Sequence, residues 1–394
     1  MPVDVVETLC DLVRLPSVNP MGRDVAGEEF HEYRVTEYLQ RFFERLDLPW
    51  RRQTIEPRQD NIVARLDGAI PPEQGGQILV LEAHQDTVPV DGMIIDPWDP
   101  QIRGGRIYGR GSCDIKGGLA CMLTVLAKLA ETRPANAPTI VMACSASEEF
   151  GQTGAKRLPE LWDDRSFLPR RPDAIIVAEP TLLNVVKAHR GCVRWHCRTR
   201  GKAAHSSQPA NGKNAIYEMA KVLAVLERYA EEVVGTLDEH PLVGRPTLSV
   251  GLISGGISVN TVPDHCRIEI DRRATPNEDP QAAYQHVVDY LQQHLPASVE
   301  VIHDPPYSLT PGLPDDCNAA LAEALSAQVQ AAGHPGEIVG APYGTDASSL
   351  GAAGIPTVVF GPGSIEQAHT VDEWIAIDQL HAMVEILEAF VLKG

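Results

Sequence analysis

Residues 78–86 read Ile-Leu-Val-Leu-Glu-Ala-His-Gln-Asp, a short apolar run that ends directly in a histidine and an aspartate. Three similar apolar runs follow along the chain, at 139–144, 174–178 and 357–360. Most are rich in Val and Ile, which is typical of strands that are buried on both faces of a parallel sheet. Because helical patterns lie between or around the runs, we predict a doubly wound α/β domain with a mostly parallel sheet.

The middle of the chain has a different pattern. Residues 193–200 alternate apolar and polar side chains, as a strand with one buried face does. A helical stripe, two strand-like runs, a second helical stripe and a last short strand follow, an order that is similar to a ferredoxin-like α+β unit. We therefore predict an inserted small domain over 186–304. The larger domain then consists of residues 1–185 and 305–394.

The composition excludes several classes of protein. The net charge is -19, and the sequence shows no basic face of the kind that binds nucleic acid. No apolar run approaches the ~18 residues that a membrane-spanning helix needs, and the first residues lack the basic and apolar regions of a signal peptide. The eight cysteines are scattered without a CxxC pair, which is typical of reduced thiols. We therefore expect a cytoplasmic protein without nucleic-acid or membrane partners.

Charged side chains gather where the predicted strands end. They follow the apolar runs or lie in a Gly-rich turn before a helix: His84, Asp86, Asp114, Glu148, Glu149, Glu179 and His369. The carboxyl ends of parallel strands meet at one edge of an open sheet, which is where ligands bind in such folds. Carboxylates gathered there would repel one another without a cation. Histidine and carboxylate ligands without thiolates suit zinc, with cobalt or manganese as substitutes.

We predict two divalent metal ions at this edge, with about three protein ligands each and one ligand shared. Asp114 is the candidate for the shared ligand, because it comes from a turn rather than from a strand. His84 and Glu179 would then complete one site. Glu149 and His369 would complete the other.

Two further carboxylates receive different roles. Asp86 lies two residues beyond His84 on an extended segment, and a metal-bound imidazole usually donates its other N–H to a carboxylate. We therefore expect Asp86 to orient His84. Glu148 neighbours a ligand but faces elsewhere, which leaves it free to act as a general base. Each of these patterns is weak alone, since adjacent glutamates, for example, usually form a solvated loop. The convergence of all the patterns at strand ends favours the metal site.

Six motifs resemble those of the aminoacylase and carboxypeptidase G metallohydrolase family. They occur in order along nearly the whole chain: LEAHQDTVP (81–89), YGRGSCDIKGG (108–118), SEEFG (147–151), AEP (178–180), GKAAHS (201–206) and GPGSIEQAH (361–369). The last is most similar to acetylornithine deacetylase and succinyl-diaminopimelate desuccinylase. The resemblance implies a zinc-binding α/β domain with an inserted lid through which two subunits form a homodimer.

The resemblance also implies roles for individual residues. It gives the same metal ligands, the same base and the same orienting aspartate as the reasoning above, and a cis peptide bond between Asp114 and Ile115. It implies that His205 hydrogen-bonds the substrate carbonyl in the other subunit of the dimer. Asn260 and Arg273 would contact the substrate, Arg273 through a bidentate grip on a carboxylate.

These observations predict a two-metal hydrolase that cleaves the amide bond of N-acyl amino acids. A metal-activated water would attack the carbonyl, with Glu148 as the general base. The alternative is a carboxypeptidase or dipeptidase on the same scaffold, acting on a short peptide. A non-catalytic metal-dependent binding protein would lack a ligand or the base, and the motifs contain all of them.

Overall fold

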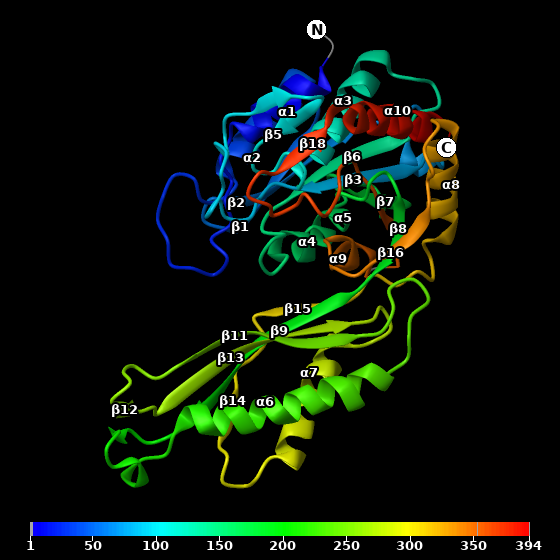
Figure 1. The fold of residues 1–394 in the computed structure, drawn as a ribbon. Coiled ribbons are helices and arrows are strands. Elements are labelled where there is room, and N and C mark those ends of the chain that lie inside the picture. The colour runs from blue at the N-terminus through cyan, green and yellow to red at the C-terminus, as the bar shows by residue number, and fades with distance from the viewer. Residues whose placement is uncertain (1–2, 353, 394) are drawn as a thin grey trace. The chain divides into compact units, whose positions relative to one another are not determined.

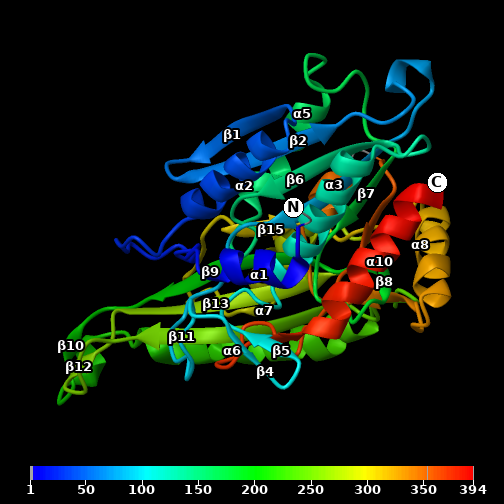
Figure 2. The same cartoon turned by 90° about the horizontal axis from the view of Figure 1, so that it is seen from above.

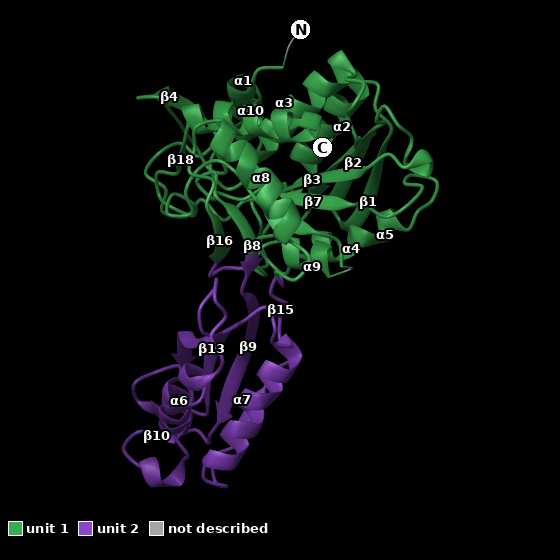
Figure 3. Cartoon of the chain, turned by 90° about the vertical axis from the view of Figure 1, so that its right-hand side faces the viewer, with its two compact units in different colours: residues 1–187, 315–340, 345–394 green, residues 188–314, 341–344 purple. Residues whose placement is uncertain are grey.

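The computed structural model describes residues 3–352 and 354–393. Contacts divide the chain into two compact units (Figure 3). Unit 1 is Met1–Lys187, Asp315–Gly340 and Thr345–Gly394, and unit 2 is Ala188–Pro314 and Ala341–Gly344. The predicted boundary at 304–305 lies inside unit 2, because strand β15 (Ser308–Thr310) pairs with strand β9 (Gly191–Arg200) and keeps the following residues in that unit.

An eight-stranded sheet forms the centre of unit 1, in the order β1-β2-β6-β3-β7-β17-β8-β16 (Figure 1). Its strands are β1 (Trp50–Glu56), β2 (Gln59–Leu66), β3 (Ile78–His84), β6 (Thr139–Ser145), β7 (Ala174–Val177), β8 (Val185–His189), β16 (Ile338–Ala341) and β17 (Thr357–Val359). A three-stranded sheet lies beside it, with β4 (Gln101–Arg103), β5 (Arg106–Tyr108) and β18 (Trp374–Ala376).

The large sheet is mixed, so the prediction of a mostly parallel sheet is wrong. Strands β6, β3, β7 and β17 are parallel to one another, whereas β1 with β2, β2 with β6 and β17 with β8 are antiparallel. Residues 57–58 connect β1 to β2 in a tight turn, which permits only antiparallel pairing. The connection from β7 to β8, residues 178–184, is also shorter than a parallel crossover needs.

Helices cover both faces of this sheet (Figure 1). One face carries α1 (Val5–Val13), α2 (Tyr33–Arg45), α3 (Lys116–Thr132), α8 (Ala319–Ala331) and α10 (Ile377–Lys393). Figure 2 shows α8 and α10 side by side on this face. The other face carries α4 (Thr153–Arg157), α5 (Pro159–Trp162) and α9 (Ala347–Gly351). Short 3-10 helices occupy Pro72–Gln74, Pro209–Asn211 and Val234–Thr236. No helix among the described residues combines the length and the apolar character that a bilayer crossing requires.

Helix α3 packs so closely on the large sheet that the turn before the helix lies at the end of strand β7. It is buried along most of its length between the sheet, α1 and α10. A Cβ atom added at Gly118 would lie 2.9 Å from the Cβ of Ala178. Because Gly118 has none, the first turn of α3 reaches the end of β7, and Asp114 arrives beside the carboxyl ends of the parallel strands.

Unit 2 contains an antiparallel sheet with the order β11-β13-β9-β14 and β15 also paired to β9. The strands not yet placed are β10 (Ala204–His205), β11 (Thr247–Gly255), β12 (Thr261–Val262), β13 (His265–Ala274) and β14 (Val301–His303). Helices α6 (Ala215–Glu232) and α7 (Pro280–His294) pack on one face of this sheet, over Trp195, Ile268 and Ile270. The alternation of buried and accessible residues along β13 leaves the other face polar.

Candidate metal centre

The charged residues that the sequence singled out follow neighbouring strands in unit 1. His84 ends β3, Glu148 and Glu149 follow β6, and Glu179 follows β7. Since these three strands are adjacent and parallel, their ends meet at one edge of the sheet. The edge therefore receives side chains from segments almost 100 residues apart.

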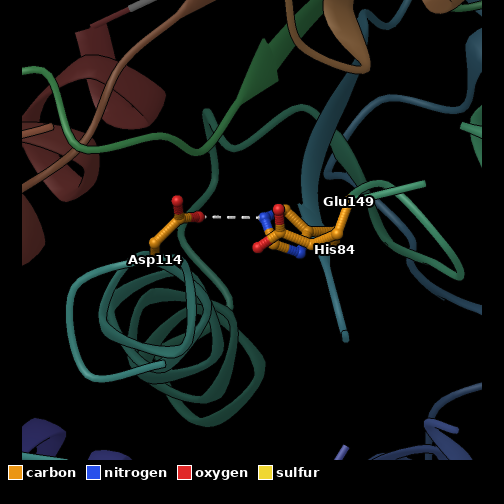
Figure 4. A group of neighbouring side chains, drawn as sticks. All are labelled: His84, Asp114 and Glu149. Atoms are coloured by element: carbon orange, nitrogen blue, oxygen red, sulfur yellow. Dashed lines mark hydrogen bonds and ion pairs between the residues drawn. The ribbon is translucent and has the colours of Figure 1, made fainter. Parts of the chain in front are cut away.

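Asp114 lies between two histidines. Its Oδ1 is 3.2 Å from Nε2 of His84 (Figure 4), and its Oδ2 is 3.3 Å from Nε2 of His369. His369 Nε2 is also 3.3 Å from Oε2 of Glu149. Ligand atoms of His84, Asp114 and Glu149 all lie within 4.8 Å of one another. A carboxylate that presents one oxygen to each of two ligand sets has the position expected of a bridge between two cations.

The carboxylates at this edge of the sheet repel one another, and a bound cation would relieve that repulsion. Oε1 of Glu149 is buried without a hydrogen-bond partner among the described residues. Burial, and next the charge of Asp114, raises the pKa of Glu179 well above its usual range. Burial and Asp114 also raise the pKa of Glu149. An orphaned buried oxygen and carboxylates that oppose each other's ionisation are the features that a divalent ion relieves.

Asp86 contacts both His84 and the loop after β6. Nδ1 of His84 lies 3.0 Å from the main-chain carbonyl oxygen of Asp86 and 3.4 Å from Oδ1 of its side chain. The same carboxylate accepts hydrogen bonds from the backbone N–H groups of Glu148, at 3.0 Å, and of Glu149, at 3.1 Å. Asn19 donates a third hydrogen bond to Asp86, at 2.8 Å. Asp86 thus holds a candidate ligand mainly through its main-chain oxygen, and the loop with the candidate base through its carboxylate.

The loop that carries Glu148 is also held by residues that sequence reasoning missed. The N–H of Ala146 donates to Oδ1 of Asn61 at 2.9 Å, and the N–H of Ser147 donates to Oε1 of Glu32 at 2.9 Å. With the two bonds to Asp86, four consecutive N–H groups of this loop donate to side-chain oxygens. Ser147 has a φ of 58°, a left-handed conformation that such a set of fixed partners can hold.

The side chain of Glu148 is held by a neighbour in the chain. Its Oε1 accepts a hydrogen bond of 2.9 Å from Nε2 of Gln152. Burial, and next the charge of Asp346, raises the pKa of Glu148 well above its usual range. A carboxylate with a raised proton affinity at the edge of the ligand cluster is suited to take a proton from water and return it.

The turn with Asp114 is fixed by Glu373, another residue that sequence reasoning missed. Oε1 of Glu373 accepts from the N–H groups of Cys113 and Asp114, both at 2.9 Å. Its Oε2 accepts from the N–H of Gly111 at 2.9 Å and from Nη1 of Arg110 at 2.8 Å. Glu373 reaches this turn because β18, which follows it, pairs with β5, which precedes the turn.

The peptide bond between Asp114 and Ile115 is cis, which confirms the expectation drawn from the resemblance. Burial raises the pKa of the Cys113 thiol well above its usual range. The thiol therefore stays protonated at neutral pH, and Cys113 packs in the core of unit 1.

The three remaining predicted site residues belong to unit 2. His205 is exposed, with Nδ1 2.7 Å from Oγ of Ser207, and the carbonyl of the exposed Asn260 accepts from the N–H of Ser206 at 3.0 Å. His205 and Asn260 thus share one end of the unit. Arg273 lies near the opposite end of β13, eight residues or ~26 Å along the strand from His265.

Comparisons with known proteins agree with this geometry. Residues 80–393 match the family model described as Peptidase family M20/M25/M40. A Myxococcus xanthus protein named acetylornithine deacetylase is 33% identical over 328 residues, 81% of this chain and 80% of that protein. A Staphylococcus aureus protein named probable succinyl-diaminopimelate desuccinylase is 28% identical over 421 residues, 98% and 97% of the two chains. A Bacillus subtilis structure described as a dinuclear metal binding peptidase of the M20 family has a TM-score of 0.67 and 16% identity, with 99% and 97% covered. That identity supports the fold alone.

Proposed function

The chain belongs to peptidase family M20/M25/M40 and is a hydrolase of amide bonds, and we propose that its substrates are N-acyl amino acids. Relatives named acetylornithine deacetylase and succinyl-diaminopimelate desuccinylase support this substrate class. The observation that carries the mechanism is the position of Asp114 between His84 and His369. Two divalent ions would be held by Asp114 with His84 and Glu179 on one side, and with Glu149 and His369 on the other.

Zinc is the ion that this donor set favours, with cobalt or manganese as substitutes. When bound, the ions supply Lewis-acid chemistry that polarises the amide carbonyl and acidifies water. Glu148 accepts a proton from the attacking water and donates it to the amine nitrogen as the C–N bond breaks. Asp86 keeps Glu148 in place, because it binds the N–H of that residue as well as the ring of His84.

Release of primary amine tests this function. The panel is N-acetylornithine, N-succinyl-diaminopimelate, N-acetylmethionine and a dipeptide, each with metal-free protein and with added zinc or cobalt. Faster hydrolysis of the acylated amino acids in the presence of metal supports the proposal. Preferential cleavage of the dipeptide would favour the peptidase alternative, and hydrolysis of none of them would reject both.

A homodimer through unit 2 is part of this proposal. Strand β11 is an edge strand of its sheet and contains no charged residue or proline, the usual protections of an exposed edge. Its Leu252 is 62% exposed and Ile253 is 56% exposed, and Val259 beyond the strand is 99% exposed. A second copy of the same strand would pair with this edge and cover these side chains.

His205 would then act across the dimer. It is carried by unit 2 at the same end as Asn260, and its ring is exposed. A donor from the partner subunit would stabilise the negative charge that develops on the carbonyl oxygen. The activity would therefore require the assembled dimer.

A further inference from the structure

A cavity of about 310 Å³ lies in unit 1, at the edge of the large sheet where strands β3 and β7 begin. Ile78, the first residue of β3, and Ala174, the first residue of β7, both line it. His84 lies at the other end of β3, six residues or ~20 Å along the strand from Ile78. The cavity is therefore separate from the candidate metal centre.

Small side chains on helix α8 leave this space open. Helices α8 and α10 lie side by side on the sheet (Figure 2). Ala324 and Ala327 are three residues apart, so they share one face of α8, and both line the cavity together with Phe390 and Val391 of α10. Because both alanines are exposed, the cavity opens to the surface and a small molecule can enter it. Its walls would cover the apolar part of such a molecule.

One positively charged side chain at this cavity has no counter-ion. Lys393, exposed at the end of α10, lines the cavity and forms no ion pair with the described residues. The carboxylate of Asp173 also lines it but is already occupied, since it accepts from Nη1 and Nη2 of Arg170 at 2.8 and 2.7 Å and from the N–H of Ile78 at 2.7 Å. A free ammonium group beside apolar walls favours a ligand with a carboxylate.

A buried acceptor at the cavity also has no partner. Oε1 of Gln328, another lining residue, is buried and accepts no hydrogen bond from the described residues. Buried polar atoms without a partner are costly, and native structures contain few of them. Because the last torsion of a glutamine side chain is broad, this oxygen can turn toward a donor in the cavity. The cavity thus offers a cation, an acceptor and apolar walls.

We propose that this cavity binds a free α-amino acid with an apolar side chain. The carboxylate of the ligand pairs with Lys393, and its ammonium group donates to Oε1 of Gln328. Its side chain lies against Ala324 and Phe390. The volume is at the lower end of the range for small-molecule sites, which suits a single amino acid better than a peptide. The inference does not depend on the proposed function, because no residue of the candidate metal centre lines the cavity.

Calorimetric titration of the zinc-loaded full chain with four compounds tests which groups are recognised. Leucine should bind. Leucinamide lacks the carboxylate, 4-methylpentanoate lacks the ammonium group and glycine lacks the apolar side chain. Each of these should bind at least ~10-fold more weakly, since a charge-assisted hydrogen bond or the buried apolar area is lost. Equal affinity for leucine and any one of the three would overturn the inference.

Two variants test the location. Lys393→Gln should weaken leucine binding at least ~10-fold and change leucinamide binding by less than about twofold, because the lost partner is that of the carboxylate. Ala327→Phe adds a ring to the cavity from an exposed position and should abolish leucine binding without lowering the Tm. The control is Lys128→Gln, at a lysine of α3 that pairs with Glu388 at 3.0 Å and does not line the cavity. It should change leucine binding by less than about twofold.

The same variants separate this cavity from the metal centre, where an amino acid would also bind as a product of the proposed activity. Leucine binding that both Lys393→Gln and Ala327→Phe leave unchanged would place the amino acid elsewhere and overturn the inference. Absence of binding by leucine and by methionine to the wild-type chain would also overturn it. Binding that is lost in both variants and kept in Lys128→Gln would support the site even if no N-acyl amino acid were hydrolysed, in which case only the proposed function would fail.

Discussion

Replacing Glu32 with glutamine should stabilise the protein more at pH 8 than at pH 5. Glu32 is fully buried, and its Oε1 accepts hydrogen bonds from the N–H of Ser147 and from Nε2 of Gln59. Its Oε2 is buried without a partner among the described residues. Burial, and next the charge of Asp86, raises the pKa of Glu32 from 4.5 to about 8.

The direction of the effect follows from proton binding. Between pH 4.5 and about 8 the folded protein keeps the proton on Glu32, whereas the unfolded chain has lost it. The free energy of unfolding therefore falls as the pH rises through this window. The difference between the two pKa values, 4.5 and about 8, lowers the free energy of unfolding by at most ~5 kcal/mol once the pH exceeds the pKa in the folded protein. Relative to its value below pH 4.5, the free energy of unfolding is lower by about 1 kcal/mol at pH 5 and by ~4 kcal/mol at pH 8.

Glutamine resembles the protonated carboxyl group and does not titrate, so it removes this pH-dependent term. The free energy of unfolding of Glu32→Gln minus that of the wild type should therefore increase by ~3 kcal/mol between pH 5 and pH 8. For a chain of this length the difference in Tm should increase by about 4 °C. Both proteins are measured with the same zinc concentration at each pH, because metal binding also depends on pH. Glu37→Gln, an exposed position on α2, is the matched control and should show no such trend. A Tm difference for Glu32→Gln that stays constant between the two pH values would refute the reasoning.

Four further substitutions test the proposed site. Glu148→Gln should bind the same amount of zinc and lower kcat by ~10²–10⁴-fold, and retention of a tenth of the activity would reject its role as base. His205→Ala subunits, inactive alone, should regain part of the wild-type activity after exchange with Glu148→Gln subunits, and proven mixed dimers without recovery would show that His205 does not act across the dimer. Leu252→Lys should give a monomer by light scattering, whereas Ile94→Lys, at an even more exposed apolar residue of unit 1, should not; an intact Leu252→Lys dimer would exclude the β11 edge. Arg273→Ala should raise KM more than it lowers kcat, and an equal change for a substrate with an amidated carboxylate would contradict a carboxylate contact.

The sequence alone predicted that His84, Asp114, Glu149 and His369 would lie together, as they do in the structure. His84, Glu149 and Glu179 each follow an apolar run within a few residues, and runs of that kind form adjacent parallel strands whose ends meet. The prediction needed only local patterns and one rule of sheet geometry. The resemblance of the motifs added the cis peptide bond that follows Asp114.

Other features depended on pairings that no local pattern records. Apolar character alone does not distinguish a parallel from an antiparallel neighbour, so the mixed sheet and the end of unit 2 at Pro314 emerged only from the strand pairing. The structure also separates two residues that the resemblance had grouped as substrate contacts, since Arg273 lies at the opposite end of unit 2 from His205.

The residues that hold the site in place were decided by the tertiary structure alone. Asn19 meets Asp86 across 67 residues, Glu32 meets Ser147 across 115, and Glu373 meets Asp114 across 259. A strand or helix repeats its pattern within a few residues, so its character can be read locally. A single hydrogen bond between distant segments has no period and no fixed spacing, and only the folded chain determines which buried oxygen receives which N–H.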